Sequence, residues 1–316
     1  MKFTVLVITY NSKWDKLELT LSSVLNQTMD EYEIVIADDG SKNNLRSEIE
    51  AYFKKRGFSN YKLVMNPENQ GTVGNIITGL EVAVGRYVKF ISAGDLLFNQ
   101  DTLQLIYEFM SEKKSESCFG LLQAYRVSEG KIEKVAFTHP FDIESYRKNN
   151  RKRIMKNLVL FSDNVCGAAI SYELNFAKEY MCKIHEQVRF EEDIFQVLAA
   201  VEGRGMDFFD EYVVWYELGT GISTKKKSDF EKMLEEDVDK FYRALYEKYP
   251  TVACVKKRYQ ILGLYKIKNI YGRTILRFLI NPYAIVYVSS YLVQRLRGCH
   301  CKGTDLVGFL EGENYK

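Results

Sequence analysis

The sequence predicts an α/β fold with a mostly parallel central sheet flanked by helices, followed by a basic helical extension. Short apolar runs alternate with amphipathic stretches over residues 5–91, which is typical of a doubly wound sheet. Between Lys256 and Lys302 there are ten Lys or Arg and no Asp or Glu, which leaves 34 basic and 42 acidic residues elsewhere, a net charge of −8. The 316 residues allow one large domain with an appendage.

The alternation gives the order of the N-terminal elements. Each expected strand is a continuous apolar run before a polar turn, as in parallel strands buried on both faces. The helices between them show apolar residues at i, i+3, i+4 and i+7. The strands are expected at 5–8, 34–37, 62–65 and 87–91, and the helices within 14–25, 49–53 and 73–84.

The elements expected after residue 100 are mixed in type. They are a hairpin over 118–127 and 132–137, strands at 164–171 and 212–216 with an Asp193-containing helix between them, and an amphipathic helix at 229–248. We place a domain boundary near residue 225, with the main domain over 1–225 and a helical region over 226–316.

Three acidic groups stand where a ligand-binding crevice is expected. Asp38-Asp39 and Asp95 each follow an apolar strand, and residues 191–193 (Glu-Glu-Asp) open an apolar-periodic helix. Open α/β sheets bind ligands beyond the carboxyl ends of their strands, so we expect all three groups to face one crevice. Carboxylates there suit a nucleotide, a divalent cation and a proton to be removed.

Each acidic group also has an ordinary structural interpretation. The run at 38–41 (Asp-Asp-Gly-Ser) is a typical turn and helix-capping pattern. Asp95 fits the N-cap of a helix that starts at Leu96. Acidic residues in the first turn of a helix, as at 191–193, are favoured by the helix dipole. The combination of the three groups indicates a site more strongly than any one of them.

The cysteine and histidine residues give little evidence of a functional site. The six cysteines (118, 166, 182, 254, 299 and 301) lack a disulfide framework spacing, which favours reduced thiols in a cytoplasmic protein. Cys299-His300-Cys301 is tightly spaced and has no second pair, so a zinc site is not expected. His139 and His185 are assigned no role. The run MKFTVLVITYN lacks a small-residue cleavage site and is interpreted as the first strand, not as a secretory signal.

Taken in order, several segments resemble the family 2 glycosyltransferases, inverting enzymes of the Rossmann-like GT-A fold. The matching segments are VLVITYNS (5–12), LSSVLNQT (21–28), YEIVIADDGS (32–41), NPENQGTVGNIITGLEVAVGRYVKFISAGD (66–95) and FEEDIF (190–195). Their order and spacing, over about two hundred residues, are more specific than any one motif. The resemblance implies transfer of a sugar from a nucleotide donor.

By this resemblance, the nucleoside is contacted by Thr9, Tyr10, Asp38 and Asp39, with Asp39 as the carboxylate that binds the base. Ser92, Gly94 and Asp95 fall where many members carry a run of aspartates, of which only Asp95 is present. A divalent metal, Mg²⁺ or Mn²⁺, would be held at Asp95 together with phosphate oxygens and water.

The Glu192-Asp193 pair matches the family's Glu-Asp pair and makes Asp193 the base by resemblance. The Arg-Asn pair common in the family is replaced by Ile76-Ile77, so no role is carried over to it. The lysines at 225–227 either approach the diphosphate or belong to a solvated linker.

The implied reaction is one in-line displacement with inversion, in which Asp193 takes a proton from an acceptor hydroxyl as the nucleoside diphosphate leaves. The expected hexosyl donor is a UDP-sugar. The expected acceptor is a lipid-linked or growing saccharide of a bacterial surface glycan, such as capsule, exopolysaccharide or lipopolysaccharide. A degenerate, non-catalytic subunit that binds a nucleotide sugar or a partner transferase is the alternative, because the aspartate run is thinned. A nucleotidyltransferase is disfavoured, because no glycine-rich, lysine-containing loop follows the first strand.

The basic tail places arginines beside an apolar stretch. Its most apolar part, 278–293, is interrupted at 281–282 and is shorter than the roughly 20 residues that span a bilayer. Since each Lys or Arg near anionic lipid contributes about 1 kcal/mol, we expect peripheral attachment to the inner face of the cell membrane. The aliphatic content disfavours nucleic acid. Packing on the chain's own domain or on another subunit, as in a homo-oligomer, stays open.

Overall fold

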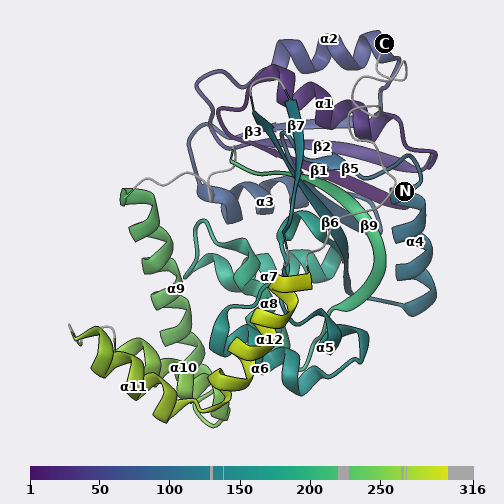
Figure 1. Ribbon diagram of the computed structural model, residues 1–316. Coiled ribbons are helices and arrows are strands. Elements are labelled where there is room, and N and C mark those ends of the chain that lie inside the picture. The colour runs from purple at the N-terminus through teal and green to yellow at the C-terminus, as the bar shows by residue number, and fades with distance from the viewer. Residues whose placement is uncertain (129–130, 138, 220–227, 265–266, 268, 298–316) are drawn as a thin grey trace.

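The computed structural model describes residues 1–297 except 129–130, 138, 220–227, 265–266 and 268 (Figure 1). Its N-terminal part is a parallel sheet covered by helices. The strands are β1 (Phe3–Thr9), β2 (Tyr32–Asp38), β3 (Tyr61–Met65) and β4 (Tyr87–Ser92), and the helices between them are α1 (Trp14–Leu25), α2 (Arg46–Arg56) and α3 (Gly71–Val82). The four strands expected from the apolar runs are confirmed.

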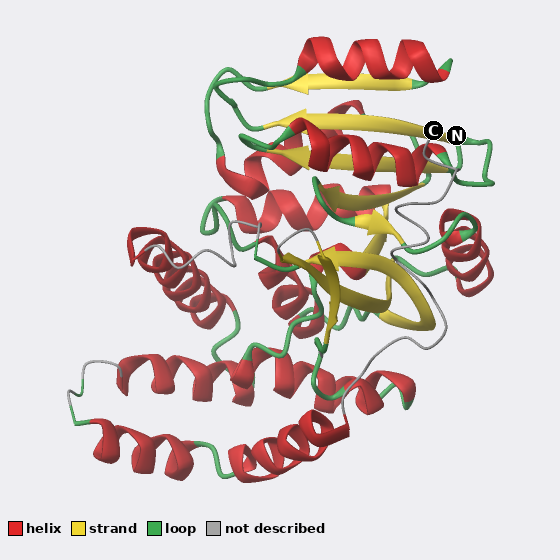
Figure 2. Ribbon diagram, turned by 45° about the horizontal axis from the view of Figure 1, so that its top comes forward, coloured by secondary structure: helices red, strands yellow, loops and turns green. Residues whose placement is uncertain are grey.

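The register of these strands brings their polar ends together. β1 lies between β2 and β4, with Thr9 opposite Asp38 and Ile8 opposite Ser92. The apolar centres of β1 and β2 are fully buried, because helices cover both faces of the sheet (Figure 2). The polar residues that follow the strands are therefore presented at one edge.

The second part of the sheet is largely antiparallel. It contains β5 (Leu96–Leu97), β6 (Ser117–Ser128), β7 (Lys131–Val135), β8 (Ile170–Glu173) and β9 (Asp207–Glu217). The path across the sheet is β3-β2-β1-β4-β8-β6-β9-β5, with β7 paired to β6. Of the pairs in this part, β6 with β9 is parallel and the others are antiparallel. The helices are α4 (Thr102–Lys113), α5 (Ile143–Arg147), α6 (Arg151–Phe161), α7 (Leu174–His185) and α8 (Phe195–Val201).

The N-cap interpretation of Asp95 is wrong. Leu96 and Leu97 form the short strand β5, which pairs with Trp215 and Val214 of β9. The following helix, α4, begins only at Thr102. Pairing with a strand more than a hundred residues away overrides the local helical pattern, which an inspection of the local sequence cannot detect.

The C-terminal helices gather at the end of the molecule away from α2 (Figures 1 and 2). They are α9 (Ser228–Lys248), α10 (Ala253–Gly263), α11 (Ile270–Ile280) and α12 (Tyr283–Arg297). The apolar stretch of the tail is divided at Asn281-Pro282 between α11 and α12. No helix in the described ranges is long and apolar enough to cross a membrane.

Candidate active site

A cleft of about 260 Å³ opens at the carboxyl ends of β1, β2 and β4. One wall comes from the residues that end or follow these strands, and the other from three segments far away in the sequence: 166–168, 190–193 and 216–217. Of the residues predicted from the sequence, the cleft is lined by Thr9, Tyr10, Asp39, Ser92, Asp95, Glu192 and Asp193. The three acidic groups thus contribute to one cleft, as the strand-end argument predicts.

Asp38 and Asp39 are adjacent but have different surroundings. The carboxylate of Asp38 is held inside its own turn, where it accepts hydrogen bonds from the backbone N–H and the hydroxyl of Ser41, at 2.8 and 2.6 Å. Asp39 lines the cleft, and its two oxygens accept from the N–H groups of Gln70 and Gly71, at 2.7 and 3.1 Å. A carboxylate has about four lone-pair sites, so Asp39 still has acceptor capacity for a ligand. Asp38 shapes the turn instead.

Asp95 is buried beside the end of β4. It accepts a hydrogen bond from the backbone N–H of Glu217, at 3.0 Å. Glu217 also lines the cleft, and its carboxylate pairs with the Nζ of Lys16 at 2.5 Å. Burial raises the pKa of Asp95 to about 7, and the neighbouring Glu217 carboxylate acts in the same direction. The sequence did not single out Glu217, because its burial depends on a lysine 201 positions away.

Gly94 lies behind this carboxylate pair and does not line the cleft. A Cβ atom at Gly94 would come within 2.3 Å of Glu217 Oε2, and the backbone φ there is +104°. Both observations require glycine at this position. Gly94 therefore makes room for Glu217 beside Asp95.

Asp193 lies in a single 3₁₀ turn directly before α8. Its Oδ2 accepts the N–H of Gly167 at 3.2 Å, and its Oδ1 is buried without a hydrogen-bond partner. A Cβ at Gly167 would come within 2.7 Å of that Oδ1, so glycine leaves space for it. Burial raises the pKa of Asp193 well above the usual range, and the charges of Glu192 and Glu191 raise it further. Such a carboxylate suits proton abstraction.

The cleft is acidic as a whole. Its described lining contains six carboxylates and no Lys, Arg or His; the six are Asp39, Asp95, Glu191, Glu192, Asp193 and Glu217. Burial raises the pKa of Glu192 to about 7, and the charge of Glu191 adds to the effect. A nucleoside diphosphate would be repelled by this lining unless a cation accompanied it.

Lys89 supports the cleft from behind, and Asn75 belongs to its lining. Lys89 is fully buried in β4, and its Nζ donates to the carbonyl of Ala168 at 2.6 Å, in the segment that faces Asp193. Burial lowers the pKa of Lys89 to about 8. The Nδ2 of Asn75, on α3, donates to the carbonyl of Ala37 at 2.9 Å. Sequence reasoning missed both residues, although a lysine inside an apolar strand run was a visible signal.

Helix α9 closes one side of the cleft although it follows the expected boundary near residue 225. Its Phe230 and Leu234 line the cleft, and Phe230 meets the ring of Phe190 edge-on at 5.3 Å. Further along, Asp237 accepts the N–H groups of Arg189 and Phe190, at 2.7 and 2.9 Å. The helix is thus attached to the segment that leads into 191–193. The lysines at 225–227 and the Cys299–Cys301 cluster lie outside the described residues.

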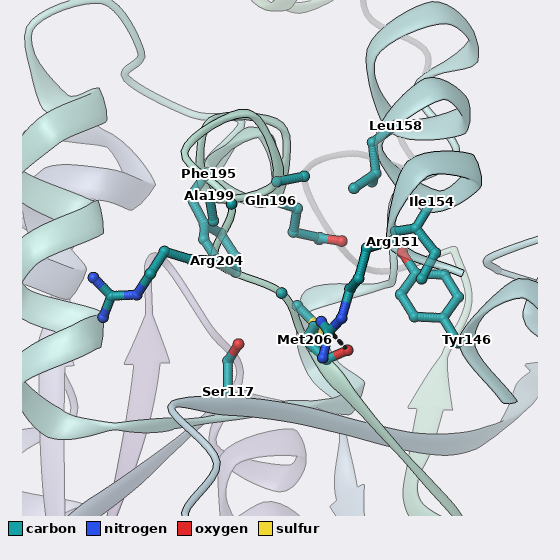
Figure 3. A pocket seen from close by; sticks show the side chains of 13 residues that line it. Ser117, Tyr146, Arg151, Ile154, Leu158, Phe195, Gln196, Ala199, Arg204 and Met206 are labelled. Carbon is teal, nitrogen blue, oxygen red and sulfur yellow. Dashed lines mark hydrogen bonds between the residues drawn. The ribbon is translucent and has the colours of Figure 1, made fainter. Parts of the chain in front are cut away.

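A second, smaller cavity of about 50 Å³ lies behind α8 (Figure 3). In Figure 3 the Arg151 guanidinium approaches Met206, whose carbonyl it contacts at 3.2 Å. Gln196, also on this cavity, holds Val165 by two hydrogen bonds of 2.7 and 2.8 Å. A volume this small fits ordered water. The two Gln196 hydrogen bonds hold Val165 next to α8.

A metal would find a restricted set of ligands. The described residues contain no cluster of three or more His, Cys, Asp or Glu side chains arranged to hold an ion. The chemistry of Asp95 nevertheless fits a hard cation that arrives with phosphate oxygens, because Mg²⁺ is commonly held by one or two carboxylates with phosphates and water. The carboxylate-rich lining favours the same partner.

Comparison with known proteins agrees with the fold. The family model for Glycosyl transferase family 2 matches residues 4–175, more than half of the chain. This match defines the class of the protein as a glycosyltransferase. The chain belongs to glycosyl transferase family 2.

Relatives of the chain include bacterial glycosyltransferases. The chain is 24% identical to the poly(ribitol-phosphate) beta-N-acetylglucosaminyltransferase TarP of Staphylococcus aureus, over 84% of this chain and 78% of TarP. It is 29% identical to the glycosyltransferase GlyA of Streptococcus pneumoniae, but spans only 26% of that protein. The structure of S. aureus TarS 1-349 in complex with UDP aligns with a TM-score of 0.51 at 17% identity, over 99% of this chain and 92% of that chain. This likeness supports the expected GT-A fold.

Proposed function

We propose that the protein transfers a sugar from a UDP-sugar to a hydroxyl of a lipid-linked or growing saccharide in bacterial surface-glycan synthesis, with inversion. The observation that carries the proposal is the gathering of Asp39, Asp95 and Asp193 on one cleft whose described lining has no basic side chain. TarP is named for N-acetylglucosamine transfer, and a TarS structure contains UDP-GlcNAc. These relatives favour a UDP-sugar, of hexosyl or N-acetylhexosaminyl type, as the donor.

The nucleoside end of the donor is assigned to the β1–β2 side of the cleft. The side chain of Asp39 can accept an N–H of the base with the lone pairs that its two backbone contacts leave. Tyr10 stands on the rim of the cleft and is partly exposed, so its ring is available to pack against a base or ribose. Thr9 donates to Asp38 at 3.0 Å and keeps the turn between them in place.

The diphosphate is assigned to the Asp95 side of the cleft. Asp95, with Ser92 nearby, would hold Mg²⁺ or Mn²⁺ that accompanies the donor, and such an ion neutralises the charge of the departing diphosphate. Lys16 keeps Glu217 paired, and the backbone N–H of Glu217 orients Asp95. Ser92, Asp95 and Glu217 thus define the end of the cleft at which the leaving group departs.

Asp193 is proposed as the general base. The N–H of Gly167 fixes one of its oxygens, and the other oxygen has no hydrogen-bond partner among the described residues, which leaves its lone pairs for an acceptor hydroxyl. The neighbouring Glu192 helps to keep the proton affinity of Asp193 high. One oxygen for orientation and one for the proton is the arrangement that a base requires.

Calorimetry with UDP, GDP and ADP tests the proposal, each nucleotide in Mn²⁺ and in EDTA, followed by turnover with a panel of UDP-sugars. We expect UDP to bind in Mn²⁺ and to lose most of its affinity in EDTA. Release of UDP from one donor should follow when a hydroxyl acceptor is added. Binding without turnover under every acceptor would favour the non-catalytic subunit instead, and equal binding of the three nucleotides would contradict the role of Asp39.

A further inference from the structure

Helix α11 is apolar, and the described part of the chain leaves it exposed. None of its eleven residues is buried in the described structure. Its exposed apolar side chains include Tyr271, Ile275, Phe278 and Leu279, of which Tyr271 is 83% and Leu279 71% exposed. These four recur at i, i+4, i+7 and i+8 and therefore share one face of the helix. A folded chain seldom leaves such a contiguous apolar face in water.

Helix α12 shows which part of the tail does pack on the chain. The ring of Tyr287 stacks on Phe161 of α6 at 3.9 Å, and the Tyr283 hydroxyl donates to Asn157 Oδ1 at 3.0 Å. Ile285 and Val288 lie on the opposite side of α12 and are exposed. The tyrosine side of α12 thus attaches the tail to α6.

The position of the tail leaves this surface accessible. Figure 2 shows α11 and α12 following one another along the edge of the molecule below α10. In Figure 1 as well, α11 lies at the end of the molecule opposite to α2. The strand ends and the cleft are elsewhere, so an extended partner at this edge would not obstruct the sheet.

The charge of the tail selects the partner. All ten ionisable Lys, Arg, Asp and Glu side chains between residues 256 and 302 are basic. Two copies of this region brought face to face would repel each other, whereas a surface of negative charge would attract it at about 1 kcal/mol per Lys or Arg. An apolar helix face within a cationic segment is the arrangement that binds anionic lipid surfaces.

We propose that the apolar face of α11 docks on the surface of an anionic lipid bilayer, with α12 holding it to α6. The proposal does not depend on the chemistry of the cleft. Because α11 is eleven residues long, it would lie in the interface and not cross the bilayer.

Sedimentation of the full chain with vesicles tests this proposal. Two vesicle types are compared: phosphatidylglycerol and phosphatidylcholine in equal parts, and phosphatidylcholine alone. We expect binding to the anionic vesicles that weakens with salt, and little binding to the neutral ones. The double variant Ile275→Asn/Leu279→Asn should reduce the partition coefficient roughly 100-fold, since each apolar side chain contributes about tenfold.

The variant Val84→Asn is the matched control, because Val84 is also exposed (59%) but lies in the loop after α3, far from the tail in the sequence. It should bind vesicles like the native chain. No binding to anionic vesicles, or equal loss in the control, would overturn the proposal. So would a native dimer that the Ile275→Asn/Leu279→Asn variant converts to a monomer, since a second copy would then be the occupant. A third outcome would also overturn it: the native chain is a monomer that does not bind vesicles, and the double variant has a lower Tm. The α11 face would then pack on other residues of the same chain. Turnover with a water-soluble acceptor should be unchanged in the variant, so the cleft is tested separately.

Discussion

Replacing Asp193 with Asn tests the proposed base with little change in shape. Asn has the same number of heavy atoms, and its carbonyl oxygen can still accept the N–H of Gly167. What it loses is the ability to take a proton, which contributes about 10²–10⁴-fold to a rate. We expect kcat to fall by that factor, equivalent to about 3–5 kcal/mol in activation free energy. The affinity for UDP should stay close to the native value.

The same substitution should stabilise the ligand-free protein. Burial and the charges of Glu192 and Glu191 raise the pKa of Asp193, so the folded state favours its protonated form more than the unfolded chain does. The contribution of this carboxyl to the free energy of unfolding is fully present below the pKa that it has in the unfolded chain. It is lost as the pH rises through the pKa that it has in the folded protein. Asn does not titrate, so the variant escapes this loss. The amide nitrogen of Asn takes the place of the partnerless Oδ1, so the gain comes from this titration alone and is measured as a higher Tm at neutral pH.

Three measurements decide the matter: release of UDP from the donor, calorimetry with UDP and Mn²⁺, and thermal unfolding at neutral pH. Asp163→Asn is the matched control. Asp163 is a buried carboxyl away from the cleft, and burial raises its pKa to about 6. The Asp163→Asn variant should therefore turn over at the native rate. Native turnover in Asp193→Asn would refute the base assignment. Loss of UDP binding together with a lower Tm would mean that Asp193 is structural.

Three further predictions concern the rest of the cleft. Asp95→Asn should weaken UDP binding in Mn²⁺ more than tenfold, while calorimetry in EDTA shows no difference, because only the metal-dependent part of the affinity is lost. Burial raises the pKa values of Asp95 and Glu192 to about 7. The free energy of unfolding of the ligand-free protein in EDTA should therefore fall as the pH rises from roughly 4 to 7. Denaturant titrations that show a rise over this range would contradict the prediction. Gly167→Ala should lower kcat and destabilise the fold by about 1–3 kcal/mol, because its Cβ would press on Asp193 Oδ1, whereas Gly263→Ala, with no atom within 4 Å, should do neither.

The parallel part of the sheet was predictable because its signals are local. A strand buried on both faces is a continuous apolar run, and the carboxyl ends of adjacent parallel strands meet at one edge. The register of β1 between β2 and β4 follows this rule, and it brings Asp39 and Asp95 to the same cleft. The order and spacing of the motifs predicted that Glu192 and Asp193 belong to the same site.

The rest of the site depends on contacts that no local pattern contains. Glu217 lies in a strand whose residues are typical of an ordinary β-sheet, and its buried carboxylate pairs with Lys16, which is distant in the sequence. Phe230 reaches the cleft because Asp237, on the same helix, caps the backbone at 189–190. A boundary near residue 225 follows from composition, but composition does not show which side chains return to the cleft.

The acidity of the cleft has a consequence for ligand binding that combines these points. The described lining holds six carboxylates and no basic side chain, although Lys16 pairs with Glu217 from outside it, and this acidity raises the free energy of the empty protein. A divalent ion alone lacks the phosphate oxygens to complete its shell. UDP alone brings negative charge to the same place. A ligand stabilises the folded state more when it binds that state more tightly. Each ligand should therefore raise Tm little by itself, whereas the two together should raise Tm by more than the sum of their separate shifts. Thermal shifts with Mn²⁺, UDP and both measure this coupling, and additive shifts would mean that the nucleotide binds without a metal at Asp95.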